Sequence, residues 1–176
     1  MVDVEYKVNN IVLTVSYKDS KFNLEKIASS LEGARHDPEV FPGVVYRKTE
    51  PKASFLIFES GEVNCLGTKS IEVAEKAIEG LTERLKRLGF EVEKPEVKVQ
   101  NMVASMDFHR RFDLERIARN FRNVECEPEV FPGLVFRIKR KNVAILLFVE
   151  GEGTCVGARS EEEIEEAIDR VVEVIE

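Results

Sequence analysis

Pro-Glu-Val-Phe-Pro-Gly occupies residues 38–43 and recurs unchanged at residues 128–133. The spacing is 90 residues, and the similarity extends well beyond the hexapeptide. Between residues 24–80 and 114–170, 23 of the 57 aligned positions are identical. A unit that occurs twice and fills most of a chain predicts a molecule with pseudo-two-fold symmetry, and therefore a ligand that is itself nearly symmetric.

Composition is that of an ordinary globular protein. Of the 176 residues, 43% are hydrophobic and 34% are charged, which is enough apolar material for a core in one domain or two joined half-domains. No apolar run reaches the roughly 18–20 residues that span a bilayer. The first residues lack the features of a signal peptide, so no membrane association is expected and the cytoplasm is the expected location.

The net charge of −7 argues against a nucleic-acid ligand only if it is spread evenly. Residues 159–176 hold eight carboxylates against two arginines, whereas residues 129–142 hold four basic residues against one glutamate. Most of the negative charge is therefore assigned to the last helix. We therefore expect a local basic edge, which includes the run Lys139-Arg140-Lys141. Two interpretations of this run stay open: contact with a phosphate backbone, and a solvated turn.

Each copy predicts the same elements in the same order: a strand, a short helix, several short strands and a long helix. The strands are expected over 8–16 and 97–105, the short helices over 24–31 and 114–121 after the caps Asn23 and Asp113, and the long helices after Ser70 and Ser160. Ser160 and Glu163 form the pattern of a capping box. We expect one antiparallel sheet, with residues 1–92 as the first repeat and 93–176 as the second.

Strand parity divides the apolar residues between two faces of this sheet. If Phe55 and Ile57 face the helices, Leu56 and Phe58 face away from them. The helices have single apolar stripes and can cover only one face, so the other face is expected to be apolar and uncovered. The second copy repeats this pattern with Ile145 and Leu147 inside, and Leu146 and Phe148 outside. Such a face indicates a binding surface, and it could also allow self-association when no ligand is present.

Catalysis and metal binding are not indicated. No nucleophile–base pair, glycine-rich phosphate loop or paired carboxylate recurs with the repeat, so no enzyme activity and no cofactor are expected. His36 and His109 have no Cys or His partner at ligand spacing, which favours surface histidines over a metal site. Three cysteines form no disulfide framework, and the repeat-equivalent Cys65 and Cys155 are expected to be small core residues.

The ordered and duplicated motifs resemble the TATA-binding protein family, its archaeal members especially, over essentially the whole chain. The motifs that carry the resemblance are Asn9–Val12 and Gln100–Val103, the doubled hexapeptide, the strands 55–58 and 145–148, and the Cys-x-Gly-x-Lys/Arg-Ser turns at 65–70 and 155–160. The resemblance implies an α+β saddle, a curved antiparallel sheet with helices on its convex face. Its concave face would lie in the minor groove of A·T-rich promoter DNA, a family mode of binding for which wedging and kinking are established.

The family pattern also assigns roles to individual residues. By similarity, Phe41 with Phe58 and Phe131 with Phe148 would wedge between base steps at the two ends of the element. Residues that would buttress these wedges are Pro42, Leu56, Pro132 and Leu146, and the remaining DNA contacts implied are Asn10, Val12, Arg47, Asn101, Val103 and Arg137. The asparagines would meet base edges and the arginines phosphates. Glu127 and Glu129 match positions that meet the B-type initiation factor.

Several positions depart from the family pattern. Where the family has a phosphate-contacting lysine after each Ser-Gly turn, this chain has Glu62 and Glu152. Leu66 and Val156 replace threonines that help to read central bases, and Asn64 and Thr154 replace valines of the groove floor. Carboxylates near phosphate repel it, so we expect weaker or more salt-sensitive DNA binding than in a typical member, or an altered preference for the DNA element.

Two functions therefore stay open at the level of sequence. The first is a general transcription initiation factor that binds and bends promoter DNA and recruits the B-type factor. The second is a divergent paralogue that keeps the fold as a protein-interaction or regulatory module with little affinity for DNA.

Overall fold

The computed structural model describes residues 3–138 and 141–176, which form two compact units. One unit comprises Asn10–Gln100, and the other comprises the residues up to Asn9 together with Asn101–Glu176. This division differs from the sequence repeats, because the first strand of each repeat contributes its amino-terminal residues to the unit of the other repeat. The two strands concerned are β1 (Glu5–Ser16) and β6 (Glu96–Asp107).

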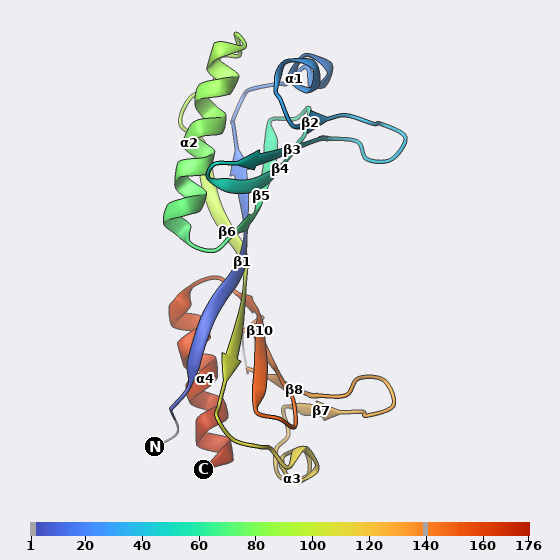
Figure 1. The fold of residues 1–176 in the computed structure, drawn as a ribbon, viewed down its shortest axis with the longest axis vertical. Helices are drawn as coiled ribbons and strands as arrows, with labels where there is room; N and C mark the ends of the chain where they lie inside the picture. The colour runs from blue at the N-terminus through green and yellow to red at the C-terminus, as the bar shows by residue number, and fades with distance from the viewer. Residues whose placement is uncertain (1–2, 139–140) are drawn as a thin grey trace. The chain divides into compact units, whose positions relative to one another are not determined.

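The unit of residues 10–100 contains five antiparallel strands in the order β2-β3-β4-β5-β1. After β1 the elements are α1 (Leu24–Ser30), β2 (Ala34–Arg35), β3 (Val44–Thr49), β4 (Lys52–Ile57), β5 (Glu62–Thr68) and α2 (Ile71–Arg87). In Figure 1, α2 lies on one side of these strands, and the loop between β2 and β3 projects on the other.

The second unit repeats this arrangement in the order β6-β10-β9-β8-β7. After β6 the elements are α3 (Leu114–Asn120), β7 (Val124–Cys126), β8 (Leu134–Arg137), β9 (Ala144–Leu147), β10 (Glu152–Ala158) and α4 (Glu161–Ile175). None of the helices in the described ranges has the length and apolar character that a bilayer crossing requires.

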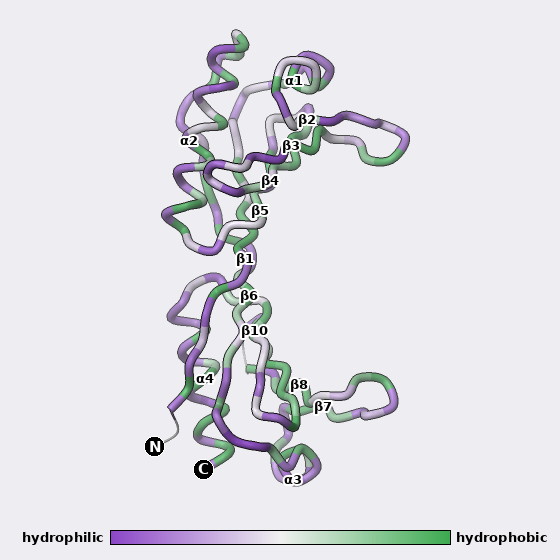
Figure 2. The backbone as a smooth tube through the Cα atoms, in the orientation of Figure 1, coloured by the Kyte–Doolittle hydropathy of each residue, from purple (hydrophilic) through white to green (hydrophobic). Residues whose placement is uncertain are grey.

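The core of each unit lies between the long helix and one face of the strands. The apolar stripe of α2 is fully buried at Ala74, Ala77, Leu81 and Leu85, as the 3.6-residue period predicts. The stripe of α4 is buried at Ile164, Ala167, Ile168 and Val171. Figure 2 shows the alternation of hydrophilic and hydrophobic backbone along both helices that results from this one-sided burial.

The predicted strand parity is confirmed. Phe55 and Ile57 are completely buried, while Leu56 and Phe58 are only half-buried. Ile145 and Leu147 are buried in the second unit, while Leu146 and Phe148 keep partial exposure. The repeat-equivalent Cys65 and Cys155 are free thiols without exposed surface, so their interpretation as small core residues is also correct.

Element ends differ slightly from the sequence expectation. Both short helices end one residue early, at Ser30 and Asn120, and both first strands begin before the expected residue. The caps Asn23, Asp113, Ser70 and Ser160 are all confirmed by side-chain oxygens that accept the expected backbone N–H.

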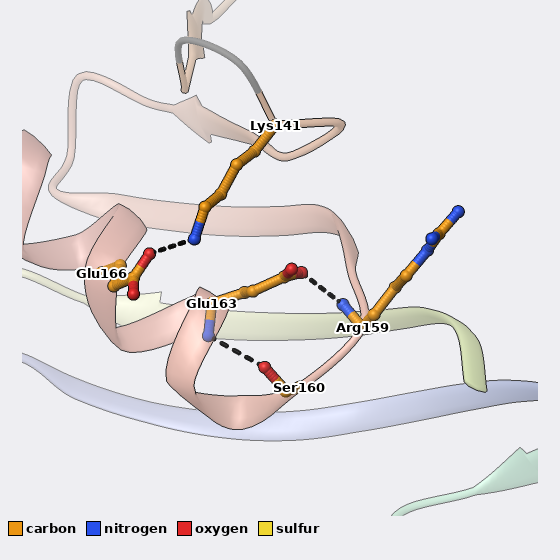
Figure 3. Close-up of polar contacts among 5 residues, drawn as sticks. All are labelled: Lys141, Arg159, Ser160, Glu163 and Glu166. Atoms are coloured by element: carbon orange, nitrogen blue, oxygen red, sulfur yellow. Dashed lines mark hydrogen bonds and ion pairs between the residues drawn. The ribbon is translucent and has the colours of Figure 1, made fainter. Parts of the chain in front are cut away.

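The capping box at Ser160 is formed in only one direction (Figure 3). Ser160 Oγ accepts the N–H of Glu163 at 3.2 Å, but the Glu163 carboxylate accepts the N–H of Arg159 at 2.8 Å rather than that of Ser160. The carboxylate thus reaches one residue further back along the chain than a capping box requires.

Candidate functional site

Each unit carries one pair of phenylalanines with the same geometry. Phe41 and Phe58 lie edge to face with ring centroids 5.6 Å apart and an interplanar angle of 62°, and Phe131 and Phe148 have the same two values. All four rings are half-buried. One ring of each pair comes from the hexapeptide and the other follows the strand β4 or β9, so the repeated sequence motif builds a repeated aromatic surface.

The glycine of the hexapeptide permits this pairing. A Cβ atom on Gly43 would lie 2.7 Å from the carbonyl oxygen of Ile57 and 3.0 Å from the ring of Phe41. On Gly133 it would lie 2.7 Å from the oxygen of Leu147 and 2.9 Å from the ring of Phe131. Any larger residue would therefore push the loop and its phenylalanine away from the neighbouring strand.

The face opposite the long helix carries matching rows of half-exposed side chains. In the first unit the cross-strand register aligns Val45, Leu56, Asn64 and Thr14. In the second unit it aligns Val135, Leu146, Thr154 and Ser105. All eight are half-buried, so neither face is covered by its own unit.

The two asparagines have fixed amide orientations. Asn10 Oδ1 accepts the backbone N–H of Gly67 at 2.8 Å, and Asn101 Oδ1 accepts that of Gly157 at 2.7 Å. Both contacts lie where the strand register shifts, and both glycines have positive φ values, of 87° and 85°. In each side chain the amide nitrogen lies on the opposite side of the amide group from this bonded oxygen, and it carries two N–H donors.

The two arginines differ in their surroundings. Arg47 and Arg137 are both exposed, but Arg137 Nε donates to Glu125 Oε1 at 3.2 Å. The position equivalent to Glu125 in the first copy is Arg35, which pairs with Val45 and so shares a face with Arg47. The first copy therefore presents two arginines where the second presents an ion pair.

The acidic departures lie at the strand starts beside the phenylalanines. Glu62 is exposed and accepts the hydroxyl of Ser16 at 2.6 Å. Glu152 is exposed and pairs in register with Asp107, which stands where the first copy has Ser16. Together with Glu5, Lys7 and Phe148 these two carboxylates line a hollow of about 480 Å³, and Asp107 gives the second unit one more carboxylate here than the first, which has Ser16.

The glutamates expected to contact a partner lie in an exposed turn. The N–H groups of Val130 and Phe131 both bond to the carbonyl of Glu127 at 2.9 Å, and the side chains of Glu127 and Glu129 point to solvent. Val130 is 79% exposed, and its counterpart Val40 is 82% exposed. Figure 2 shows this apolar stretch in each projecting loop.

The structure brings most of the residues singled out in the sequence to the surface opposite the helices. Half-exposed are Asn10, Val12, Phe41, Leu56, Phe58, Asn101, Val103, Phe131, Leu146 and Phe148. Exposed are Pro42, Arg47, Glu127, Glu129, Pro132 and Arg137. Their contacts with DNA or a partner stay predictions.

The basic run behaves differently. Lys141 forms an ion pair with Glu166 of α4 (Figure 3), and hydrogen bonding to Glu166 raises the pKa of the Lys141 ammonium. The positive charge of Lys141 is therefore paired with a carboxylate of α4. Lys139 and Arg140 lie outside the described residues.

Sequence reasoning missed Glu125, Arg35 and Asp107. Comparison of the two copies at these positions would have found them, since each is a charge difference between equivalent residues. Within residues 3–138 and 141–176, no group of three or more His, Cys, Asp or Glu side chains could hold a metal ion.

Comparison with known proteins agrees with this geometry. The family described as "Transcription factor TFIID (or TATA-binding protein, TBP)" matches residues 5–88 and 96–176. The TATA-box-binding protein of Picrophilus torridus is 44% identical over 93% of this chain and 90% of its own length. That of Methanocaldococcus jannaschii is 42% identical over 99% of this chain and 96% of its own.

A solved structure gives the same result for the fold. The structure titled "Methanococcus jannaschii TBP" superposes with a TM-score of 0.87 at 42% identity, and covers 97% of this chain and 98% of that chain. The predicted α+β class with an antiparallel sheet is therefore confirmed.

Proposed function

This chain belongs to the TATA-binding protein family, and on that premise we propose that it is a general transcription initiation factor that binds the minor groove of A·T-rich promoter DNA and bends it. The observation that carries the proposal is the pair of edge-to-face phenylalanines in each unit, with the same separation and angle in both. Aromatic wedges of this kind unstack base steps at a cost of a few kcal/mol each, which the additional buried apolar surface offsets.

The asparagine geometry supports the minor groove as the target. Because Asn10 and Asn101 use their oxygens on Gly67 and Gly157, they offer N–H donors to a ligand. The minor groove of A·T pairs presents only acceptors, adenine N3 and thymine O2, and presents them alike for A·T and T·A. A two-fold pair of donors fits that pattern, whereas a guanine amino group would meet them with another donor.

Charged residues complete the proposed interface. Arg47 and Arg137 would contact phosphates, the half-exposed Val12 and Val103 would contact the groove floor, and Leu56 and Leu146 would support the wedges. Pro42 and Pro132, next to the wedges, would support them. Glu127 and Glu129, which are exposed in their turn, would contact the B-type initiation factor.

Quantitative binding to labelled duplexes tests the proposal. We expect an A·T-rich TATA-like duplex to bind more tightly than a G·C-rich one, with increased end-to-end energy transfer that reports bending. Phe58→Ala and Phe148→Ala should each weaken binding roughly 10- to 100-fold, since a wedge of this kind contributes about 1–3 kcal/mol. Phe121→Ala, at the end of α3, serves as the matched control and should leave binding unchanged. Absence of A·T preference at every salt concentration, also with the B-type factor present, would contradict the proposal.

A second function is favoured by the exposed Glu62 and Glu152 beside the wedges. In this alternative the chain is a divergent paralogue that acts as a protein-interaction or regulatory module. It requires weak DNA binding even at low salt, and tight binding at moderate salt would exclude it. Light scattering of the DNA-free protein in the same buffers would show whether the uncovered apolar face leads to self-association.

A further inference from the structure

A groove lies between α2 and the start of β6, on the helical side of the first unit. Its volume is about 670 Å³. Its apolar wall includes Ile78 and Pro95, together with Val97, which is 41% exposed. Val97 is thus an exposed apolar side chain at the start of a strand, next to a helix whose core-facing residues Ala77, Leu81 and Leu85 are fully buried.

The second unit closes the equivalent place with its own side chain. The residue that corresponds to Val97 is Tyr6 in β1, and the residue that corresponds to Glu75 is Glu165 in α4. Tyr6 donates its hydroxyl hydrogen to Glu165 Oε1 at 2.8 Å and is half-buried. Burial and the hydrogen bond with Glu165 raise the pKa of Tyr6 to about 12. The two copies thus show the same position filled by tyrosine and left open by valine.

Charge defines what could fill the open groove. Glu75, Glu79 and Glu83 are exposed on successive turns of α2 and line it. At the end of α2 the charge reverses: Lys86 lies 4.0 Å from Glu83, and Lys94 follows the helix. Positive charge is therefore favoured near Glu75 and Glu79, and disfavoured at the far end.

We propose that this groove is a docking site for a segment of a partner protein in which a tyrosine is flanked by lysine or arginine. The tyrosine ring lies on Val97 and Pro95, and its hydroxyl donates to Glu75, as Tyr6 does to Glu165 in the other unit. The basic neighbours of the tyrosine face Glu79. Aromatic anchors in apolar pockets with a charged rim are the usual energetic centre of such contacts.

This site is separate from the proposed DNA interface. Its residues lie on α2 and beside it, whereas the half-exposed rows of Val45, Leu56, Asn64 and Thr14 lie on the face away from α2. The acidic rim consequently does not oppose phosphate, and a partner could dock while DNA is bound.

The test uses the full chain and the peptide Ac-Lys-Val-Lys-Tyr-Lys-Val-NH2. This peptide has the sequence of residues 3–8 with lysine in place of Asp3 and Glu5. We expect saturable binding, followed by the methyl NMR signals of Val97 and Ile78. Val97→Tyr should fill the groove and weaken binding by about tenfold or more, while Tyr6→Val should open a second site and double the stoichiometry. Glu75→Gln should weaken binding several-fold, and a peptide with alanine in place of tyrosine should not bind.

Three results would overturn the proposal: no saturable binding up to roughly 1 mM peptide, equal affinity in Val97→Tyr, or binding that is unchanged by loss of the tyrosine. Thermal unfolding of each variant confirms that the fold is kept. DNA binding by Val97→Tyr should equal that of the wild type, so failure here and failure of the proposed function are distinguished.

Discussion

At the scale of single residues, the hexapeptide glycines explain why the repeated motif has been kept in both copies in the same form. A Cβ added to Gly43 or Gly133 would lie 2.7 Å from a strand carbonyl oxygen and would crowd the paired phenylalanine rings. The geometry of each phenylalanine pair therefore depends on the small size of the neighbouring glycine.

We expect Gly133→Ala to destabilise the protein by about 1–3 kcal/mol, because the added methyl overpacks against a backbone carbonyl that cannot move freely. It should also weaken DNA binding, since Phe131 is displaced from Phe148. Chemical denaturation and duplex binding measure the two effects.

The control for this substitution is Gly80→Ala in the middle of α2. There the Cβ meets only the flexible end of Lys48, and alanine favours a helix by roughly 0.5–1 kcal/mol over glycine. It should be neutral or stabilising and leave DNA binding unchanged. Equal stability of Gly133→Ala and the wild type would contradict the steric account.

At the scale of elements, periodicity was sufficient for most of the structure. The stripe of α2, the caps at Ser70 and Ser160 and the faces of β4 and β9 follow from side-chain spacing alone.

Sequence was not sufficient where partners far apart along the chain decide the geometry. The orientation of the Asn101 amide depends on Gly157 at a register shift. Whether Arg137 is paired depends on Glu125 of the neighbouring strand β7. Local patterns do not contain this information, although the duplicated sequence does reveal that position 125 differs from position 35.

Strands β5 and β10 each bury one thiol, and this gives a prediction for alkaline pH. Burial raises the pKa of Cys65 to about 12 and that of Cys155 to about 11, from an ordinary value near 9.0. Their contribution to stability is complete below about pH 9 and is lost as pH rises toward 11–12, because only the unfolded thiols ionise in that range.

Urea unfolding between pH 7 and pH 11 should therefore show a decrease above about pH 9, which becomes smaller in the double variant Cys65→Ala, Cys155→Ala. In the folded protein at mildly alkaline pH, a thiol reagent should modify only the half-exposed Cys126. Comparable reaction rates for all three cysteines would show that the strands do not shield their thiols.

At the scale of the whole molecule, the net negative charge repels DNA, but the distribution of the carboxylates still permits binding. The net charge is −7, yet many carboxylates lie on the long helices, as at Glu161, Glu162 and Glu163 in the first turn of α4. Glu62 and Glu152 are different, because they lie at the starts of β5 and β10 beside the phenylalanine pairs, where phosphates would pass in the proposed complex.

We expect the double variant Glu62→Lys, Glu152→Lys to bind A·T-rich DNA more tightly and with a steeper dependence on salt. Of the alternatives expected for the wild type, we adopt weaker binding rather than greater salt sensitivity. Two additional phosphate contacts should increase the slope of log K against log salt by about 1.8, because each contact releases about 0.9 counterion. Binding isotherms between about 50 and 300 mM salt, a roughly sixfold range that includes the physiological value, measure this slope.

The matched control has the same change in total charge on the helical side. Glu79 in α2 and Asp169 in α4 are repeat-equivalent and exposed, so Glu79→Lys with Asp169→Lys alters the net charge equally without adding phosphate contacts. If both double variants gain the same affinity and slope, net charge alone governs binding and the strand-start glutamates have no local role. If only Glu62→Lys, Glu152→Lys gains affinity and slope, the carboxylates of Glu62 and Glu152 act locally on the DNA at the two ends of the element. Electrostatic repulsion, rather than the contacts of the proposed phenylalanine wedges, then limits the affinity of the wild type.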